Sequence, residues 1–162
     1  MRVAIISDTH IPSRADEIPA WVREKVQQAD HTIHAGDFDS RDAFETVQEL
    51  ADDPTVVRGN MDPSLGLPEV ETVDLAGVRF VVTHGTGSLD DYRERVAGIV
   101  ADHAENPTIG VCGHTHQLMD ETVNGIRLLN PGSATGADPA STVSMMSAEV
   151  TDGEIDVTVH EQ

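Results

Sequence analysis

Short apolar runs and helical periodicities alternate in the first half of the chain. Residues 3–7 and 32–35 are apolar and rich in β-branched side chains, which predicts two buried strands. Between them, Pro19 precedes apolar residues at helical spacing, which predicts a helix that ends near residue 29. Ser40 is a suitable N-cap for a second helix over residues 41–50, and residues 55–57 predict a third strand.

The second half contains mostly paired strands. Turn dipeptides separate three pairs of strand-like runs, which are 71–75 with 78–83 around Ala76-Gly77, 118–123 with 126–129 around Asn124-Gly125, and 142–150 with 154–160 around Asp152-Gly153. Such dipeptides between alternating runs predict β-hairpins. A helix over residues 89–104 capped by Ser88, and a buried strand over 108–112, complete the pattern. The mixture predicts an α/β (α+β) protein with two sheets and outer helices.

The length of 162 residues suits a single domain spanning 1–162 with a full core. No apolar run approaches the roughly 20 residues that cross a bilayer, and no signal-peptide pattern follows Met1, so we expect no membrane association. The sole cysteine, Cys112, has no partner for an internal disulfide, which fits a cytoplasmic protein.

The charge balance is strongly acidic. Asp and Glu number 29 against 10 Lys and Arg, for a formal net charge of −19, and lysine occurs only at Lys25. Such a field repels nucleic-acid backbones, so we expect no binding to nucleic-acid polymers. The near absence of lysine beside persistent arginine favours a halophilic protein over one that is merely acidic and soluble, because high salt screens the self-repulsion.

Polar residues of metal-binding types follow the predicted strands at several places. These residues are Asp8, His10, Asp37, Asn60, His84, His114 and His116. Ligands in open α/β sheets gather beyond the carboxyl ends of the strands, so parallel neighbouring strands would bring these side chains together. Seven polar side chains cannot share a buried place without partners, and a pair of metal ions would satisfy them.

The types of ligand narrow the choice of ion. Mixed oxygen and imidazole ligands suit Mn, Fe, Ni, Co or Zn rather than Ca or Mg. A carboxylate such as Asp37 can bridge two ions, and two ions about 4 Å apart can clamp an in-line displacement at phosphorus. The sequence therefore predicts a dinuclear centre with manganese as the first choice of metal.

In order along the chain, these residues form the pattern Asp-x-His, Gly-Asp, Gly-Asn, His, Gly-His-x-His from Asp8 to His116. The pattern resembles that of the calcineurin-like metallophosphoesterases. Small size, Gly-Asn-Met-Asp at 59–62 and Asn-Pro-Gly-Ser at 130–133 resemble the compact YfcE-type phosphodiesterase branch. The resemblance implies a four-layer α-β-β-α sandwich with two mixed sheets.

The resemblance also implies a ligand set and a mechanism. One ion would be held by Asp8, His10, Asp37 and His116, and the second by Asp37, Asn60, His84 and His114. A hydroxide bridging the ions would attack a small phosphodiester in line. The residues implied in catalysis are Asn60, Asp62, His84 and Asp37, and those implied in phosphate binding are Asn60 and Arg58.

Met61 departs from the wider family, which often has a histidine here that assists the leaving group. Asp62 is then the remaining candidate acid, although a carboxylate at ordinary pKa is a poor one. We therefore expect good turnover of activated aryl phosphodiesters and slow turnover of alkyl esters.

Other interpretations stay open. A phosphomonoesterase or nucleotidase would need more cations for the second phosphate charge than the chain offers. The retromer vacuolar sorting subunit, an interaction scaffold, resembles the same branch. The natural substrate, the native metal and the oligomeric state are also open, a homodimer through exposed sheet edges being one option. His34, beside Gly36-Asp37, is expected to be a core or interface histidine.

Overall fold

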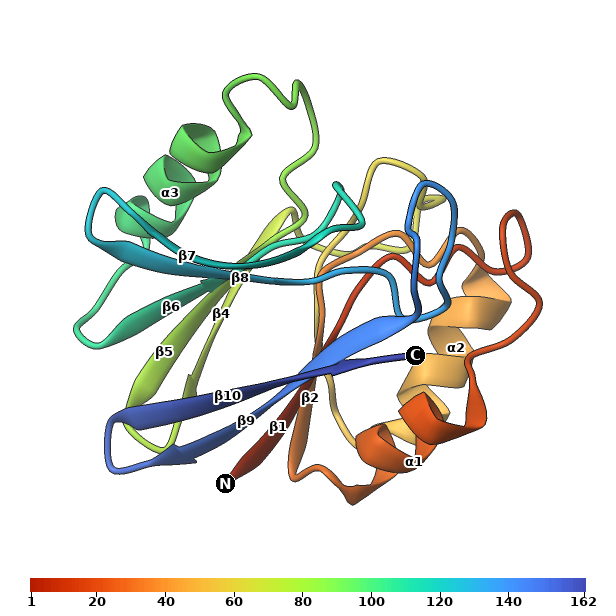
Figure 1. The fold of residues 1–162 in the computed structure, drawn as a ribbon, viewed down its shortest axis with the longest axis horizontal. Coiled ribbons are helices and arrows are strands. Elements are labelled where there is room, and N and C mark those ends of the chain that lie inside the picture. Colours follow the sequence, from red (N-terminus) through yellow and green to blue (C-terminus); the bar gives the residue numbers. More distant parts are fainter.

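The computed structural model describes all residues from 1 to 162 and consists of two five-stranded sheets packed face to face, with helices on the outside (Figure 1). The first sheet has the strand order β10-β9-β1-β2-β3, and the second has the order β4-β5-β6-β8-β7. The first sheet comprises β1 (Arg2–Ile6), β2 (His31–His34), β3 (Thr55–Val56), β9 (Ser144–Thr151) and β10 (Glu154–Glu161). The second comprises β4 (Val70–Leu75), β5 (Val78–Thr83), β6 (Thr108–Val111), β7 (Leu118–Val123) and β8 (Ile126–Pro131).

Both sheets are mixed. In the first sheet, β1, β2 and β3 run parallel, and β9 pairs antiparallel with both β1 and β10. In the second, β5, β6 and β8 run parallel, and the hairpins add β4 and β7 at the edges. The three predicted hairpins are therefore present, and parallel pairing occupies the interior of each sheet and reaches an edge only at β3.

Three apolar clusters hold the layers together. Alternate residues of β1 face opposite sides, so Val3 and Ile5 pack between the sheets whereas Ala4 and Ile6 pack under the first two helices, α1 (Ala20–Gln28) and α2 (Arg41–Leu50). On the other side, α3 (Tyr92–Asp102) covers the second sheet through its own cluster. The order of layers is helix, sheet, sheet, helix, which confirms the predicted sandwich.

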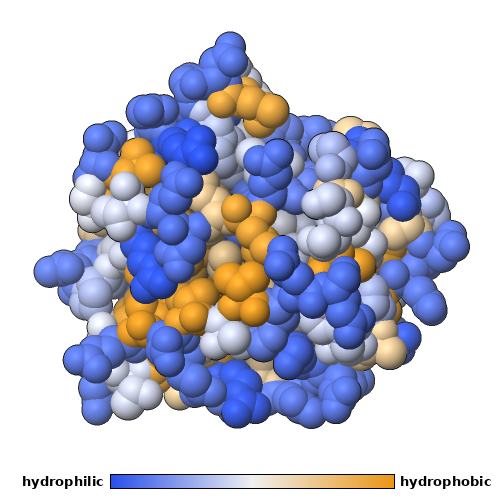
Figure 2. All heavy atoms as spheres, viewed as in Figure 1, coloured by the Kyte–Doolittle hydropathy of each residue, from blue (hydrophilic) through white to orange (hydrophobic).

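The surface is largely hydrophilic in the view of Figure 2, and apolar atoms show mainly near the middle of that face. Leu118 of β7 and two residues of β10, Ile155 and Val157, are partly buried against the core between the sheets. None of the three helices has the length and hydropathy needed to cross a membrane.

The helix boundaries agree with the sequence at α2 but not at α3. The hydroxyl of Ser40 accepts a hydrogen bond from the backbone N–H of Ala43 at 3.1 Å, as expected of an N-cap. The prediction that α3 begins at residue 89 under a Ser88 cap was wrong, because the helix begins at Tyr92. The carbonyls of Gly85, Thr86 and Ser88 instead accept hydrogen bonds from the guanidinium group of Arg95, which keeps this segment as a loop.

The loops after β1, β2, β5 and β6 converge at one end of the sandwich (Figure 1). Backbone hydrogen bonds join these loops within each sheet, from Asp8 N–H to Gly36 C=O and from Gly113 N–H to His84 C=O. The backbone N–H of His114 donates to the carboxylate of Asp8, which links the two sheets. The predicted meeting of strand ends thus takes place between two sheets rather than within one.

Candidate metal centre

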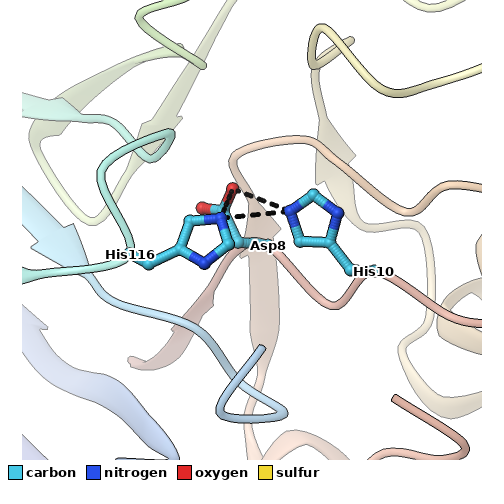
Figure 3. Close-up of side chains that lie close together, drawn as sticks. All are labelled: Asp8, His10 and His116. Carbon is cyan, nitrogen blue, oxygen red and sulfur yellow. Dashed lines mark hydrogen bonds and ion pairs between the residues drawn. The ribbon is translucent and has the colours of Figure 1, made fainter. Parts of the chain in front are cut away.

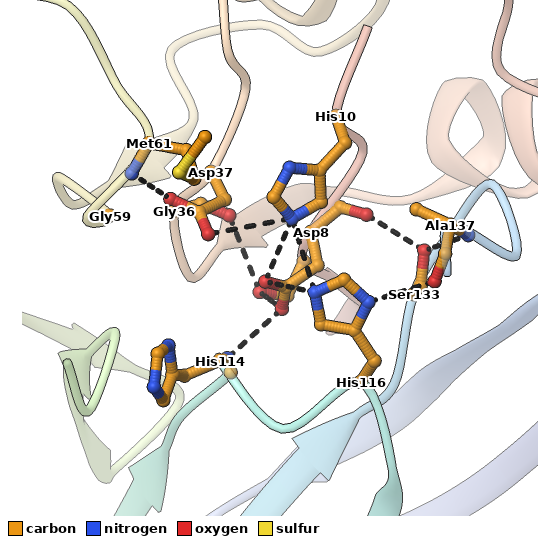
Figure 4. Close-up of polar contacts among 12 residues, drawn as sticks. Asp8, His10, Gly36, Asp37, Gly59, Met61, His114, His116, Ser133 and Ala137 are labelled. Carbon is orange, nitrogen blue, oxygen red and sulfur yellow. Dashed lines mark hydrogen bonds and ion pairs between the residues drawn. The ribbon is translucent and has the colours of Figure 1, made fainter. Parts of the chain in front are cut away.

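Two buried carboxylates lie at the middle of this convergence, and each has one oxygen held by the protein and one directed into the site. For Asp8, Oδ2 accepts hydrogen bonds from the Ser7 hydroxyl at 2.6 Å and the His114 N–H at 3.1 Å. Oδ1 of Asp8 is the one buried side-chain nitrogen or oxygen without a hydrogen-bond partner. For Asp37, Oδ1 accepts from the Met61 N–H at 2.8 Å, and Oδ2 lies 3.1 Å from Nε2 of His84. Both carboxylates therefore direct one oxygen into the site (Figure 4).

Four histidines surround these carboxylates, and one nitrogen of each ring is engaged by an oxygen acceptor. Nδ1 of His10 faces Asp39 Oδ1 at 2.8 Å, Nδ1 of His84 faces Ala35 C=O at 2.7 Å, Nδ1 of His116 faces Ala137 C=O at 2.8 Å, and Nε2 of His114 faces Gly87 C=O at 3.1 Å. A carbonyl or carboxylate accepts a proton from the ring nitrogen that it faces. When the ring is neutral, its other nitrogen therefore presents a lone pair, which is the arrangement of metal-ligating histidines.

These lone pairs point at one another. Nε2 of His10 lies 3.1 Å from Nε2 of His116, and Oδ1 of Asp8 lies 3.2 Å from the latter (Figure 3). Oδ1 of Asn60 lies 3.0 Å from Nε2 of His84 and 3.2 Å from Nδ1 of His114. Acceptors brought this close repel one another unless a proton or a metal ion lies between them.

The donor atoms accordingly fit divalent transition-metal ions, which take mixed oxygen and imidazole ligands. Two groups of three residues bring ligand atoms within 4.8 Å of one another, namely Asp8 with His10 and His116, and Asp8 with Asp37 and His84. The structure thus brings together all seven of the side chains that the sequence placed at strand ends.

The carboxylates and imidazoles shift one another's protonation. Burial opposes a charge on Asp8, but the imidazoles of His10, His116 and His84 around it outweigh burial and hold its pKa below the ordinary range. Burial also disfavours a charge on His84, but its hydrogen bond with Asp37 and the charge of Asp8 raise the pKa of His84 to about 9. Burial and the neighbouring His84 lower the pKa of His114. A cation at the centre would displace the proton from His84.

The backbone at the centre is strained. Five of the candidate ligand residues have left-handed backbone conformations, with φ values of 54° at Asp8, 45° at His10, 65° at Asp37, 74° at His114 and 61° at His116. Residues other than glycine seldom adopt this region, and each such residue costs on the order of 1–3 kcal/mol in the less favourable cases. The surrounding hydrogen bonds hold these turns, which direct the ligand atoms inward.

Ser133 is one source of that support. Its hydroxyl donates to the carbonyl of Asp8 at 2.7 Å and accepts from the N–H of Ala137 at 2.9 Å. The same turn presents the Ala137 carbonyl to His116 (Figure 4). Ser133 therefore couples the backbone position of Asp8 to the orientation of the His116 ring.

Asp62 lies beside the centre but faces the backbone. Its side-chain oxygens accept four hydrogen bonds, from the N–H groups of Asp37, Phe38, Asp39 and Gly59, at distances from 2.6 to 3.0 Å. All of its acceptor capacity is used in holding the turns that carry Asp37 and Asn60. The predicted role of Asp62 as a proton donor does not fit this geometry.

His34 and Arg58 occupy different environments. His34 is fully buried, stacks on Phe38 with ring centroids 3.8 Å apart, and accepts a hydrogen bond from Gly36 N–H through Nδ1. It is therefore a core residue beneath the centre, as expected. Arg58 is exposed and lines a cavity next to Asn60 and His84.

Asp39 is a site residue that the sequence did not indicate. It follows Asp37 by two residues, and in so acidic a chain a further aspartate carries little signal. Its carboxylate nevertheless faces His10, and burial raises its pKa. The acceptors for the other three histidines are backbone carbonyls, which side-chain identity cannot reveal.

Known proteins share this sequence and fold. A probable metallophosphoesterase of Methanothermobacter thermautotrophicus is 34% identical over 96% of this chain and 91% of its own length. One of Methanocaldococcus jannaschii is 33% identical over 83% of this chain and 69% of its own length.

Among solved structures, a Vps29 mutant from Entamoeba histolytica matches over 100% of this chain and 99% of its own, with a TM-score of 0.81 and 26% identity. A predicted phosphoesterase from Streptococcus pneumoniae matches over 99% of this chain and 88% of its own, with a TM-score of 0.73 and 25% identity. The profile described as the calcineurin-like phosphoesterase superfamily domain matches residues 1–153. The chain therefore belongs to the calcineurin-like phosphoesterase superfamily, whose members use divalent metals.

Proposed function

We propose that this protein is a dinuclear metal-dependent phosphodiesterase acting on small phosphodiesters. The observation that carries the proposal is the buried, unpartnered Oδ1 of Asp8, which faces the lone-pair nitrogens of His10 and His116. Catalytic metal centres have ligands of this kind together with room for substrate, and a cavity of about 440 Å³ opens beside His84 and Asn60.

The ligands divide into two sets that share Asp37. Asp8, His10, Asp37 and His116 would hold one ion, and Asp37, Asn60, His84 and His114 would hold the other. Bound ions of this kind supply a nucleophile at neutral pH and neutralise charge on the phosphate. Manganese is our first choice, and a zinc complex of wild-type Vps29 from Entamoeba histolytica, 26% identical, shows that a relative takes a transition metal.

The residues of the chain would position the substrate. The side-chain amide of Asn60 can donate to a phosphate oxygen while its carbonyl oxygen faces His84 and His114. Arg58, exposed beside Asn60, adds positive charge at the entrance. Met61 presents its backbone N–H to Asp37, and the residue is 45% exposed. Because neither Met61 nor Asp62 is suited to protonate a leaving group, aryl diesters should react faster than alkyl diesters.

A diester fits the charges better than a monoester. A phosphate monoester carries a second negative charge, which calls for further cations close to the centre. The guanidinium of Arg95 already binds three backbone carbonyls, so Arg58 is the cation left free at this cavity.

Paired assays test the proposal. Hydrolysis of bis(4-nitrophenyl) phosphate with Mn²⁺ should exceed that of 4-nitrophenyl phosphate. Asp37→Ala should abolish it, whereas the matched surface change Asp52→Ala should leave it intact. Faster hydrolysis of the monoester would favour the phosphomonoesterase interpretation.

The match to Vps29 supports a second candidate, an interaction scaffold with the same fold. A scaffold does not need metal-dependent turnover. Absence of hydrolysis of either substrate by protein with two bound Mn²⁺ ions per chain would favour this candidate over the enzyme.

A further inference from the structure

A polar cavity of about 440 Å³ lies directly beside the candidate metal ligands Asn60 and His84. One wall is the segment after β3. The backbone N–H of Arg58 donates to the carbonyl of Pro68 at 2.8 Å, which places Arg58 next to the segment that contains Glu69. The other wall is formed by the residues that follow β5 and by Arg95 and Ile99 of α3. A group attached to a phosphate at the centre would have this space open to it.

The lining of this cavity is mostly polar. Of its 11 lining residues only Val70 and Ile99 are hydrophobic, and none is Phe, Tyr or Trp. Nucleobases and aryl groups bind through stacking on aromatic faces and through apolar contact. The cavity is therefore poorly suited to those groups and better suited to a hydrophilic one.

The charge in the cavity is unusual for this chain. Two arginines line it against one glutamate, although acidic residues outnumber basic ones by 29 to 10 in the whole protein. Arg95 is committed to the carbonyls of Gly85, Thr86 and Ser88. No ion pair involves Arg58, although Arg95 and the arginines on the strands (Arg2, Arg79 and Arg127) are all paired with acidic side chains. A free guanidinium next to a metal centre is a ready partner for a carboxylate or phosphate.

We propose that this cavity binds the alcohol portion of the substrate and selects a small hydroxylated alcohol that carries a second anionic group, a carboxylate or a phosphate. Arg58 binds that distal anion and Glu69 opposes it. The inference depends on the proposed phosphodiesterase function, because it names the substrate class of the same centre. It also assigns Arg58 to the distal group rather than to the reacting phosphate.

Matched probes test the selection. 3-Phosphoglycerate and glycerol 3-phosphate share one skeleton and differ in that the former has a carboxylate where the latter has a hydroxymethyl group. Each is used as a competitive inhibitor of bis(4-nitrophenyl) phosphate hydrolysis by Mn²⁺-loaded protein, and its direct binding is measured by calorimetry. A partly exposed charge pair is worth on the order of 1 kcal/mol, so 3-phosphoglycerate should bind about fivefold more tightly.

Two variants of opposite charge sharpen the test. Arg58→Gln should reduce the ratio of the two affinities to about one, and Glu69→Gln should increase it by about two- to fivefold. Arg23→Gln, which removes a guanidinium on the exposed side of α1, serves as the control and should leave the ratio unchanged. The preference for 3-phosphoglycerate over glycerol 3-phosphate should also weaken as the salt concentration is raised.

The outcomes separate this inference from the proposed function. If bis(4-nitrophenyl) phosphate is not hydrolysed at all, the proposed function fails, and calorimetry still reports whether the carboxylate is preferred. If it is hydrolysed but the two probes bind equally, or Arg58→Gln leaves their ratio unaltered, the assignment of the cavity is overturned.

Discussion

His10 and His116 face each other through their Nε2 atoms at 3.1 Å, although the Nδ1 atom of each ring already lies within hydrogen-bond distance of an oxygen. With both Nδ1 atoms protonated, two lone pairs meet at that distance. A cation between them turns repulsion into ligation, so the acceptors behind the rings determine how well the pair binds metal.

Asp39 is the acceptor behind His10, and its replacement should weaken metal binding. Asp39→Asn keeps the shape of the side chain but removes the charge that makes His10 a stronger ligand. We expect metal affinity to fall by about 10- to 100-fold, as is typical when such an outer partner is lost. Competition with a chromophoric chelator measures the effect, with Asp52→Asn as the control. Equal affinities for the two variants would mean that Asp39 does not orient the ring.

The raised pKa of His84 predicts a pH dependence of opposite sign in metal-free and metal-loaded protein. With a folded pKa of about 9 against an ordinary 6.5, His84 stabilises the metal-free fold below about pH 6.5, and this contribution is lost as the pH rises through 9. The free energy of unfolding of the chelator-treated protein should therefore decrease between pH 6.5 and 9.

Metal binding displaces the same proton and so becomes stronger over that range. The apparent affinity should rise by up to about tenfold per pH unit from this proton alone, and His116, whose pKa is also raised, adds to the trend. Denaturant titrations at several pH values, with and without Mn²⁺, test both the predicted fall in the stability of the metal-free protein and the predicted rise in metal affinity. A metal affinity that does not change between pH 6.5 and 8.5 would contradict the assignment of His84 as a ligand.

Asp62 should matter for stability and for placement of the ligands rather than as an acid. Asp62→Asn replaces one accepting oxygen by an amide group, which leaves backbone N–H groups of the buried turns facing a donor. We expect a loss of about 3 kcal/mol in the free energy of unfolding, since each buried unsatisfied donor costs about 1–3 kcal/mol. Urea denaturation provides the measurement.

Kinetics of the same variant separate the two roles of Asp62. A residue that positions the turns affects aryl and alkyl diesters alike, whereas a proton donor matters mainly for alkyl esters with poor leaving groups. A selective loss of alkyl ester hydrolysis with normal stability would restore Asp62 as an acid.

The sequence was most informative where structure is determined locally. Dipeptides such as Asn124-Gly125 specify tight turns by themselves, and the hairpins they predict are present. The start of α3 depends on Arg95, whose side chain binds the preceding carbonyls, and residues 89–91 therefore stay outside the helix. The pairing of β1 with β9 joins residues about 145 positions apart, such as Ala4 with Ser147, and no local pattern specifies it.

In the candidate site, too, some features could be predicted from local sequence and others depend on the whole fold. Side-chain ligands at strand ends were visible in the sequence because their residue types are chemically distinctive. The groups that orient them were not, because three of the four acceptors behind the histidines are main-chain carbonyls, of Ala35, Gly87 and Ala137. Every residue carries a main-chain carbonyl whatever its side chain is, so only the fold determines which carbonyls face the rings.

Two glycines with opposite surroundings give a final test of how tightly the centre is packed. A Cβ atom added to Gly59 would lie 2.7 Å from Cγ of Asp37 and closer still to its carboxylate oxygen, whereas one added to Gly98 of α3 would meet no atom within 4 Å. Gly59→Ala should therefore displace Asp37 and sharply reduce metal affinity and hydrolysis. Gly98→Ala should stabilise the protein by about 0.5–1 kcal/mol, because alanine is the better helix former. Metal titration and thermal unfolding of both variants would check this contrast. If Gly59→Ala bound metal as tightly as the wild type, the Asp37 carboxylate could not occupy the central position that these distances give it.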